Sequence, residues 1–357
     1  MAESLGSAAT RVALIKVGAL GDVLRTTALL PGLRRLVPRL ELTWVTAREA
    51  FPLVPGPPLV SRVVNYLDPP DRPWRHDCYD WVISLDDEPA SCELASALCG
   101  RRLSGAYRDD EGRLCYTPDV EPWFGMGRLR RPEDGGLTRA NELKRSNRND
   151  YGTLLYRALG LPQPVERPIL AVPGEDRARA IEWMKARRGD HRVAIGLNTG
   201  AGGRWRYKSW GTDETARLAS LTAGRLDALV VILGGPAERE RNAKIVERAK
   251  CPAVLAAPCD LPILSFAALI EQLDALVSSD SLAMHIGIAL RCPVVALFGP
   301  TSDAEIDLFG LGEKMVTPLD CRCCYLSDCD VRPNCMQSIS VDSVAEAVER
   351  WARPRRG

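Results

Sequence analysis

Short apolar stretches that alternate with helix-like segments are the feature that most constrains the fold of this chain. In the second half these stretches cover 192–199, 228–235, 274–280 and 292–300. Strands that are apolar on both faces belong inside a parallel sheet that helices cover on both sides. In the first half, strand-like stretches cover 12–17, 40–47, 62–67 and 81–85. The alternation therefore predicts an α/β protein with two Rossmann-like, doubly wound domains.

Composition marks the joints between these domains. Residues 108–148 are polar and rich in glycine, proline and arginine, which predicts a long binding or disordered loop. Residues 161–168 have the proline content of a linker. We expect an N-terminal domain over 1–165 and a C-terminal domain over 166–340. An amphipathic helix in 341–357 is expected to pack back toward the N-terminal domain.

Length and charge restrict the class of protein. The chain has 357 residues, of which 46% are hydrophobic and 26% charged, the balance of a globular protein. A net charge of +1 gives no electrostatic case for nucleic-acid binding. No apolar run approaches the roughly 20 residues that span a bilayer, and the N-terminus lacks a secretory signal pattern. We expect a cytoplasmic enzyme with at most peripheral membrane contact, for which 123–131 is the candidate docking segment.

The first candidate site follows the first strand-like stretch. Gly18 and Gly21 flank a tight turn before Asp22, and helical spacing begins directly afterwards. The pattern is not the GxGxxG of dinucleotide-binding folds. Asp22 could simply cap the helix. Alternatively, it could act chemically, because ligands bind beyond the carboxyl ends of parallel strands.

Two further turns carry groups suited to a phosphate. Thr199 and Gly200 follow a strand-like stretch and precede Lys208, so backbone N–H groups and a cation could meet an anion there. The alternative is a flexible turn with a solvated basic edge. Gly235 and Glu238 follow the next such stretch, where Glu238 could reach a sugar hydroxyl or merely begin a helix.

A fourth turn combines acidic and polar side chains at the start of a helix. Asp280 and Ser281 lie where the free N–H groups of a helix favour an anion. Leu282 follows them, and His285 lies about one turn into the helix on the same face. A single histidine is more often structural, but this one lies beside a candidate anion site.

Five of the twelve cysteines lie within 321–335. Such a cluster indicates metal or redox chemistry before structural disulfides in a cytosolic chain. Cys321, Cys324, Cys329 and Cys335 could supply four tetrahedral thiolates to a structural metal. The alternative is a compact loop whose cysteines pack, form disulfides or stay free.

Taken together, these motifs resemble the heptosyltransferase family, the ADP-heptose-dependent enzymes of lipopolysaccharide core assembly. The stretches that carry the resemblance are GALGDVLRTTALLPGL, VVILGGPAE, SSDSLAMHIGIAL, ALFGPTS and CRCCYLSDCDVRPNCM. The resemblance implies a GT-B fold, with two domains facing a central cleft. It also implies an inverting glycosyltransferase that needs no cofactor for its chemistry.

The resemblance also implies roles for individual residues. Asp22 corresponds to the general base, on the acceptor side together with Gly18 and Gly21. Lys208 is the second catalytic residue and counters charge on departing ADP, and Thr199 contacts the diphosphate. The other donor-binding positions are Gly200, Gly235, Glu238, Asp280, Ser281, Leu282 and His285. Leu282 stands where the family usually has glycine, so a branched side chain crowds the approach to the donor.

The acceptor and two other functions stay open at this point. The acceptor is a glycolipid of the lipopolysaccharide type or a soluble natural product, the second because arginine-rich usage indicates a GC-rich source. One alternative is a nucleotide-sugar epimerase on the same fold, which would turn over its substrate without an acceptor. Another is a non-catalytic nucleotide-sugar-binding protein whose cysteine loop holds a metal or senses redox state.

Overall fold

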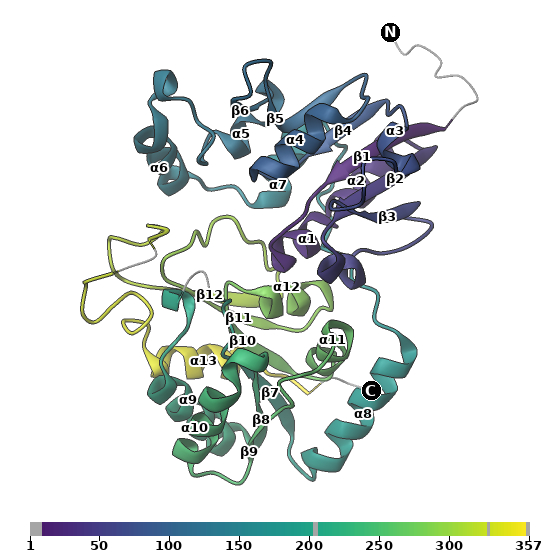
Figure 1. The fold of residues 1–357 in the computed structure, drawn as a ribbon. Coiled ribbons are helices and arrows are strands. Elements are labelled where there is room, and N and C mark those ends of the chain that lie inside the picture. The colour runs from purple at the N-terminus through teal and green to yellow at the C-terminus, as the bar shows by residue number, and fades with distance from the viewer. Residues whose placement is uncertain (1–8, 203–205, 327–328, 355–357) are drawn as a thin grey trace. The chain divides into compact units, whose positions relative to one another are not determined.

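The computed structural model describes residues 9–202, 206–326 and 329–354. The chain divides into two compact units, Met1–Leu170 and Ala171–Gly357 (Figure 1). Residues 203–205 of the glycine-rich turn lie outside the described residues, as do 327–328 of the cysteine-rich segment. Each unit has a sheet of mainly parallel strands with helices on both faces, as the apolar stretches predict.

The sheet of the N-terminal unit has the strand order β3-β2-β1-β4-β5-β6. Its strands are β1 (Thr10–Ile15), β2 (Leu40–Thr46), β3 (Arg62–Asn65), β4 (Trp81–Ser84), β5 (Leu103–Arg108) and β6 (Leu114–Tyr116). All pairs are parallel except β5 with β6. In the central register, Leu14 of β1 lies between Trp44 and Ile83.

Alternate residues of β1 enter different cores because side chains alternate across a strand. Val12 and Leu14 pack with helices of one face, and Ala13 and Ile15 with helices of the other. The first face carries α2 (Leu29–Leu36) and α7 (Tyr151–Leu159), and the second carries α3 (Pro73–His76) and α4 (Pro89–Ala97). Gly32 lets α2 approach α7, since a Cβ there would lie 2.8 Å from the Tyr156 ring. This close packing holds α7 against α2.

The structure corrects the long loop expected over 108–148. This stretch forms β6, η2 (Pro118–Val120), α5 (Glu121–Phe124), η3 (Pro132–Asp134) and α6 (Gly136–Ser146). Phe124, Met126 and Leu129 are buried, and α5 packs on α7. The apolar residues of the expected membrane-docking segment 123–131 are therefore largely core residues. The polar composition of 108–148 does not predict these short helices, because single buried side chains anchor them.

The sheet of the C-terminal unit is fully parallel, in the order β12-β11-β10-β7-β8-β9. Its strands are β7 (Val193–Asn198), β8 (Ala228–Leu233), β9 (Val254–Ala256), β10 (Ala275–Ser279), β11 (Val294–Phe298) and β12 (Gly312–Val316). Its helices are α8 (Gly174–Arg188), α9 (Thr212–Leu226), α10 (Arg239–Ala249), α11 (Ile263–Glu271), α12 (Leu282–Ala289) and α13 (Val341–Trp351). Figure 1 shows these helices around the sheet of this unit.

The C-terminal helix α13 belongs to the core of the C-terminal unit. Val341, Val344 and Val348 are buried there, and α13 packs on α9 and the ends of β10 to β12. Arg350 adds an ion pair to Glu313 of β12 at 2.9 Å. The apolar face that was expected to pack toward the N-terminal domain is thus buried within the C-terminal unit.

Both sheets reverse their strand order beside the first strand of the unit. In the N-terminal unit β1 lies between β2 and β4, and in the C-terminal unit β7 lies between β8 and β10. Ligands of open α/β sheets bind at such switch points, outside the carboxyl ends of the strands. The residues that follow β1, β4, β7 and β10 therefore lie where a ligand of each unit would bind.

Candidate active site

Asp22 lies in the first turn of α1 (Leu20–Thr26), directly after the turn that follows β1. The N-cap is Ala19, and no side chain caps this helix. Asp22 is therefore not the capping residue that the alternative interpretation allowed. Its Oδ1 lies 2.9 Å from Nη2 of Arg25, and 35% of its side chain is exposed. Gly18 lies in open space, since a Cβ there would meet no described atom within 4 Å.

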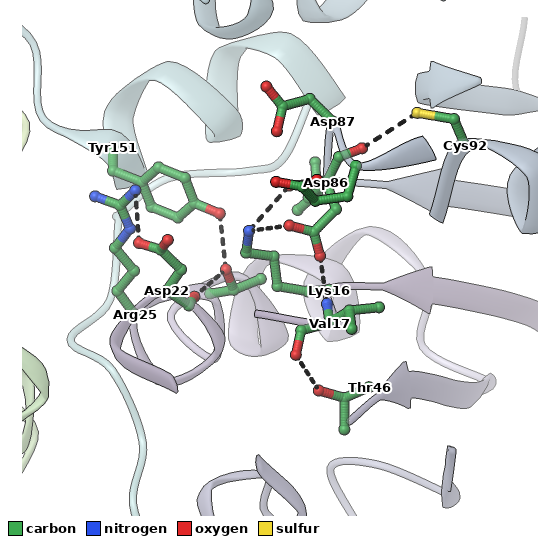
Figure 2. A network of polar contacts seen from close by, with 12 residues as sticks. Lys16, Val17, Asp22, Arg25, Thr46, Asp86, Asp87, Cys92 and Tyr151 are labelled. Carbon is green, nitrogen blue, oxygen red and sulfur yellow. Dashed lines mark hydrogen bonds and ion pairs between the residues drawn. The ribbon is translucent and has the colours of Figure 1, made fainter. Parts of the chain in front are cut away.

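A buried ion pair lies beside Asp22 at the same switch point. Lys16 follows β1 and Asp86 follows β4, and Lys16 Nζ lies 2.7 Å from Asp86 Oδ1 with both side chains 8% exposed. Lys16 also donates to the Leu85 carbonyl, and Val17 N donates to Asp86 Oδ2 (Figure 2). Burial lowers the pKa of Lys16, but the charges of Asp86 and Asp22 raise it above its usual value.

Sequence reasoning missed Lys16, Asp86 and Arg25 as members of this group. A signal existed for the first two. Lys16 interrupts an apolar run, and Asp86 comes directly after the strand-like stretch that ends at residue 85. Charged residues at the ends of buried strands rarely stay buried without a partner. Their proximity still depends on β1 and β4 being neighbours, which the sequence does not state.

The switch point of the C-terminal unit gathers Lys208, Asp280 and His285. Lys208 belongs to η4 (Arg206–Lys208) and its Nζ lies 2.9 Å from Asp280 Oδ2 and 3.3 Å from the Asp280 carbonyl. The other carboxylate oxygen of Asp280 lies 3.9 Å from Nε2 of His285. His285 is buried within α12, on the helix that follows Asp280. Three of the predicted donor-site residues therefore come together.

A polar network supports the start of α12. Asn198 Nδ2, at the end of β7, donates to the Gly200 carbonyl at 2.8 Å and to Ser278 Oγ and Ser281 Oγ at 3.2 Å. Ser281 is the N-cap of α12 but makes no side-chain cap bond. Leu282 follows it as the first residue of the helix and is half-buried. The network fixes the turns after β7 and β10 to each other.

Thr199 is engaged within the protein. Its hydroxyl lies 2.6 Å from Asn242 Oδ1, its N–H donates to the Leu233 carbonyl, and its own carbonyl accepts from Arg241 Nη1 at 3.2 Å. The side chain is also buried. This placement does not support the predicted diphosphate contact at Thr199, whose polar groups hold the turn instead.

Glu238 also has an internal role. Its Oε2 accepts a hydrogen bond from the Gly235 N–H at 2.9 Å, where η5 (Pro236–Glu238) leads into α10. A Cβ at Gly200 would lie 3.3 Å from the same oxygen, so the two glycine turns touch through Glu238. Glu238 thus lies where a helix begins, and its contact with a sugar hydroxyl stays a prediction.

Of the two interpretations of the cysteine-rich segment, the metal site is not formed in the part of the chain that is described. Within 9–202, 206–326 and 329–354, no three His, Cys, Asp or Glu side chains are placed to hold a metal ion. Cys321 is exposed, whereas Cys335 is buried over Gly299. Burial raises the pKa of the Cys335 thiol to about 11, and Cys324 adds to the effect.

The cysteine-rich segment instead contacts both sides of the C-terminal switch point. Tyr207, next to Lys208, donates to the Cys329 carbonyl at 3.3 Å. Tyr325 lies beyond β11, where its hydroxyl accepts from Ser302 N and bonds to Glu305 at 3.1 Å. Burial, Glu305 and Asp280 raise the pKa of Tyr325 well above its ordinary value.

No helix among the described residues is both long and apolar enough to cross a bilayer.

The comparisons with known proteins agree with this architecture. The sequence profile of glycosyltransferase family 9 (heptosyltransferase) matches residues 143–323. Lipopolysaccharide heptosyltransferase 1 of Pseudomonas aeruginosa is 24% identical over 348 residues, which cover 90% of this chain and 88% of that protein. A family 9 glycosyltransferase from Veillonella parvula has a TM-score of 0.69 at 19% identity, covering 96% of this chain and 97% of the other. The E. coli ADP-heptose lipopolysaccharide heptosyltransferase II has a TM-score of 0.67 at 19% identity, with 96% and 98% covered.

Two Rossmann-like α/β units of this topology make up the GT-B fold. The chain belongs to glycosyltransferase family 9, the heptosyltransferase family. The fold and the enzyme class predicted from the sequence are confirmed. The roles of individual residues remain proposals.

Proposed function

We propose that this chain transfers a heptose from ADP-heptose to a hydroxyl group of an acceptor, with inversion at the anomeric carbon. Membership of the family supports the sugar transfer, and the names of two relatives support this donor. One observation carries the assignment of roles. The carboxylate of Asp22 lies at the switch point of the N-terminal unit, and the ammonium of Lys208 lies at that of the C-terminal unit.

Asp22 acts as the general base in this proposal. The acceptor oxygen forms a bond to the anomeric carbon while the bond from that carbon to the ADP oxygen breaks. The hydroxyl proton moves to the Asp22 carboxylate, and ADP leaves with the electron pair. A positioned carboxylate typically contributes about 10²–10⁴-fold to such a step.

Lys208 stabilises the negative charge that develops on ADP. A lysine ammonium has three N–H donors, so it can hold Asp280 and a phosphate oxygen together. Asp280 accepts a hydrogen bond from the Lys208 ammonium and so orients it. His285 lies near the other carboxylate oxygen of Asp280. Preorganised charge of this kind is commonly the largest catalytic contribution. In this proposal Lys208 supplies positive charge at the leaving diphosphate.

The acceptor remains one of two classes, a glycolipid of the lipopolysaccharide type or a soluble natural product. Segment 123–131 does not favour a membrane surface, because its apolar side chains are mainly buried. Its cations are also engaged: Arg128 pairs with Glu88 at 3.2 Å and Arg130 with Glu121 at 2.7 Å. Assays with ADP-heptose and each acceptor class in turn would separate the two.

Calorimetric titration with ADP, UDP, GDP and dTDP tests the donor. We expect selective binding of ADP, weakened about 10- to 100-fold in Lys208→Ala, the range for a charge-assisted hydrogen bond. Lys185→Ala, an exposed lysine on α8, is the matched control and should bind ADP like the parent protein. Preference for another nucleotide would contradict the donor, and unchanged affinity in Lys208→Ala would contradict the role of this lysine.

Turnover of ADP-heptose tests the base. Asp22→Asn should lower kcat at least about 100-fold and leave ADP affinity unchanged, because the substitution lies in the other unit. Retention of kcat would remove Asp22 from the base role.

A further inference from the structure

Arg25 occupies an unusual position for a residue next to a catalytic carboxylate. It lies in the last turn of α1 with its side chain only 14% exposed. Its guanidinium carbon lies 4.1 Å from the ring centroid of Tyr151 and 5.3 Å from that of Trp123. The same guanidinium places Nη2 2.9 Å from Asp22 Oδ1. Two aromatic rings thus hold the cation that touches the proposed base.

The aromatic rings are themselves fixed. Trp123 meets Tyr151 edge to face, with centroids 4.9 Å apart and planes at 82°. The Tyr151 hydroxyl lies 2.7 Å from Thr26 Oγ1, and Thr26 Oγ1 donates to the Asp22 carbonyl at 2.7 Å. Since the threonine proton goes to that carbonyl, Tyr151 donates to the threonine. Burial raises the pKa of Tyr151, although Lys16 and Arg25 lower it, so the tyrosine remains a donor.

Asp22 is therefore fixed at two points by one group of residues. Arg25 holds its carboxylate, and the Tyr151–Thr26 pair holds its carbonyl (Figure 2). Trp123 comes from α5 and Tyr151 from α7. The structured stretch that the sequence presented as a loop thus supplies the first ring, and the helix after it supplies the second.

We infer that Arg25, held between Trp123 and Tyr151, is a positioning residue for Asp22. It keeps the carboxylate ionised before the proton transfer and holds it in a fixed direction toward the acceptor. The inference rests on the proposed base role of Asp22. A cation beside a carboxylate favours the ionised form, and an arginine fork between rings has little freedom to move. A flexible lysine at this place would supply the charge without the fixed direction.

Other charges around Asp22 define the background for a pH experiment. The titratable or charged groups on the elements around it include Lys16, Arg48, Glu49, Asp86, Asp87 and Tyr151, with Glu121 of α5 and with Tyr156 and Arg157 of α7. Lys16 is paired with Asp86, and Arg48 and Glu49 of η1 (Arg48–Leu53) are exposed. Arg25 forms an ion pair with Asp22 at 2.9 Å. Its removal should therefore produce the largest change in how activity depends on pH.

The test compares pH profiles of kcat/KM for Arg25→Met, Arg25→Lys and Trp123→Leu. Arg25→Met should move the acid limb up by about one to two pH units, because the cation paired with the carboxylate is lost. Arg25→Lys should leave the acid limb near its place and lower kcat about 10- to 100-fold through misplacement. Trp123→Leu should behave like Arg25→Lys. Arg139→Met, an exposed arginine on α6, is the control and should match the parent protein.

Each outcome decides the inference. If Arg25 had only a structural role, its substitution would lower the stability and the active fraction of the protein, but the acid limb of Arg25→Met would stay in place. That result overturns the inference. Circular dichroism and urea unfolding of each full-length variant show whether the N-terminal unit, which carries the substitutions, has folded. If Arg25→Met does not fold, parental kcat in both Arg25→Lys and Trp123→Leu overturns the inference. Active Asp22→Asn would instead show that the proposed base role has failed.

Discussion

The buried pair of Lys16 and Asp86 allows a sharp prediction about stability. Both side chains are 8% exposed, and the two charged atoms lie 2.7 Å apart. Asp86 also accepts from the Val17 N–H, and Lys16 has the Leu85 carbonyl as a further acceptor at 3.2 Å. Substituting Asp86 therefore leaves a buried ammonium with one neutral partner and Asp22 nearby.

The size of the effect depends on what replaces the carboxylate. Asp86→Ala removes both the charge and the acceptor of Val17, so it should cost about 3–5 kcal/mol of unfolding free energy. Asp86→Asn keeps an oxygen for Val17, so the cost should be about 1.5–3 kcal/mol, the range for a hydrogen bond to a charged group. The double variant Lys16→Met/Asp86→Asn should lose clearly less than the sum of its single variants, because no uncompensated charge remains.

Urea unfolding of the full-length chain, followed by tryptophan fluorescence, measures these differences. The control is Glu142→Gln, which breaks an ion pair between Arg139 and Glu142 that is more than half exposed on both sides. That pair should contribute less than about 0.5 kcal/mol. If Asp86→Asn destabilises no more than Glu142→Gln, the Lys16–Asp86 pair is not the buried charge pair that the geometry indicates.

Three further predictions concern other parts of the chain. Iodoacetamide at neutral pH should label exposed Cys321 readily and buried Cys335 slowly, as peptide mass spectrometry can show; equal rates would contradict the burial of Cys335. Cys78 and Cys99 are exposed with their sulfurs 3.1 Å apart, so oxidised glutathione should link them by thiol–disulfide exchange, releasing reduced glutathione and raising the Tm; a native mass without loss of two hydrogens would refute this. Hydrogen bonds from Arg350 lower the pKa of Glu313 in the folded protein. Their stabilisation is therefore present above the unfolded pKa near 4.3 and is lost as pH falls through the folded pKa. The difference in unfolding free energy between the parent protein and Glu313→Gln should shrink over that window.

The sequence predicts the sheets well because buried parallel strands are apolar without interruption. It misses α8 because Ala180 and Met184 are the only apolar side chains of that helix that are buried, which leaves a weak periodic pattern. It also presents 108–148 as a loop, although Phe124 and Met126 anchor short elements there. Isolated anchors have no period, so their burial emerges only from the tertiary fold.

The candidate site shows the same division. Asp22, Lys208 and Asp280 are predictable because each lies beside a glycine turn or at a strand end. Thr199 has the right residue type and location, but its polar groups are used by Asn242 and neighbouring backbone, contacts that depend on how β7 and β8 pair. Arg25 gave no local signal, since its significance comes from rings about 100 and 125 residues away.

Each proposed catalytic ion in this chain already has a partner of opposite charge: Asp22 has Arg25, and Lys208 has Asp280. Such pairs contribute little to stability when they are partly exposed, so stability alone is a weak reason for their presence. Their value lies in direction, because charge fixed before the reaction needs no reorganisation during it. Without Arg25 the Asp22 carboxylate could still accept a proton, but its direction would no longer be fixed. The rate of sugar transfer should therefore depend on Arg25 more strongly than the stability of the fold does.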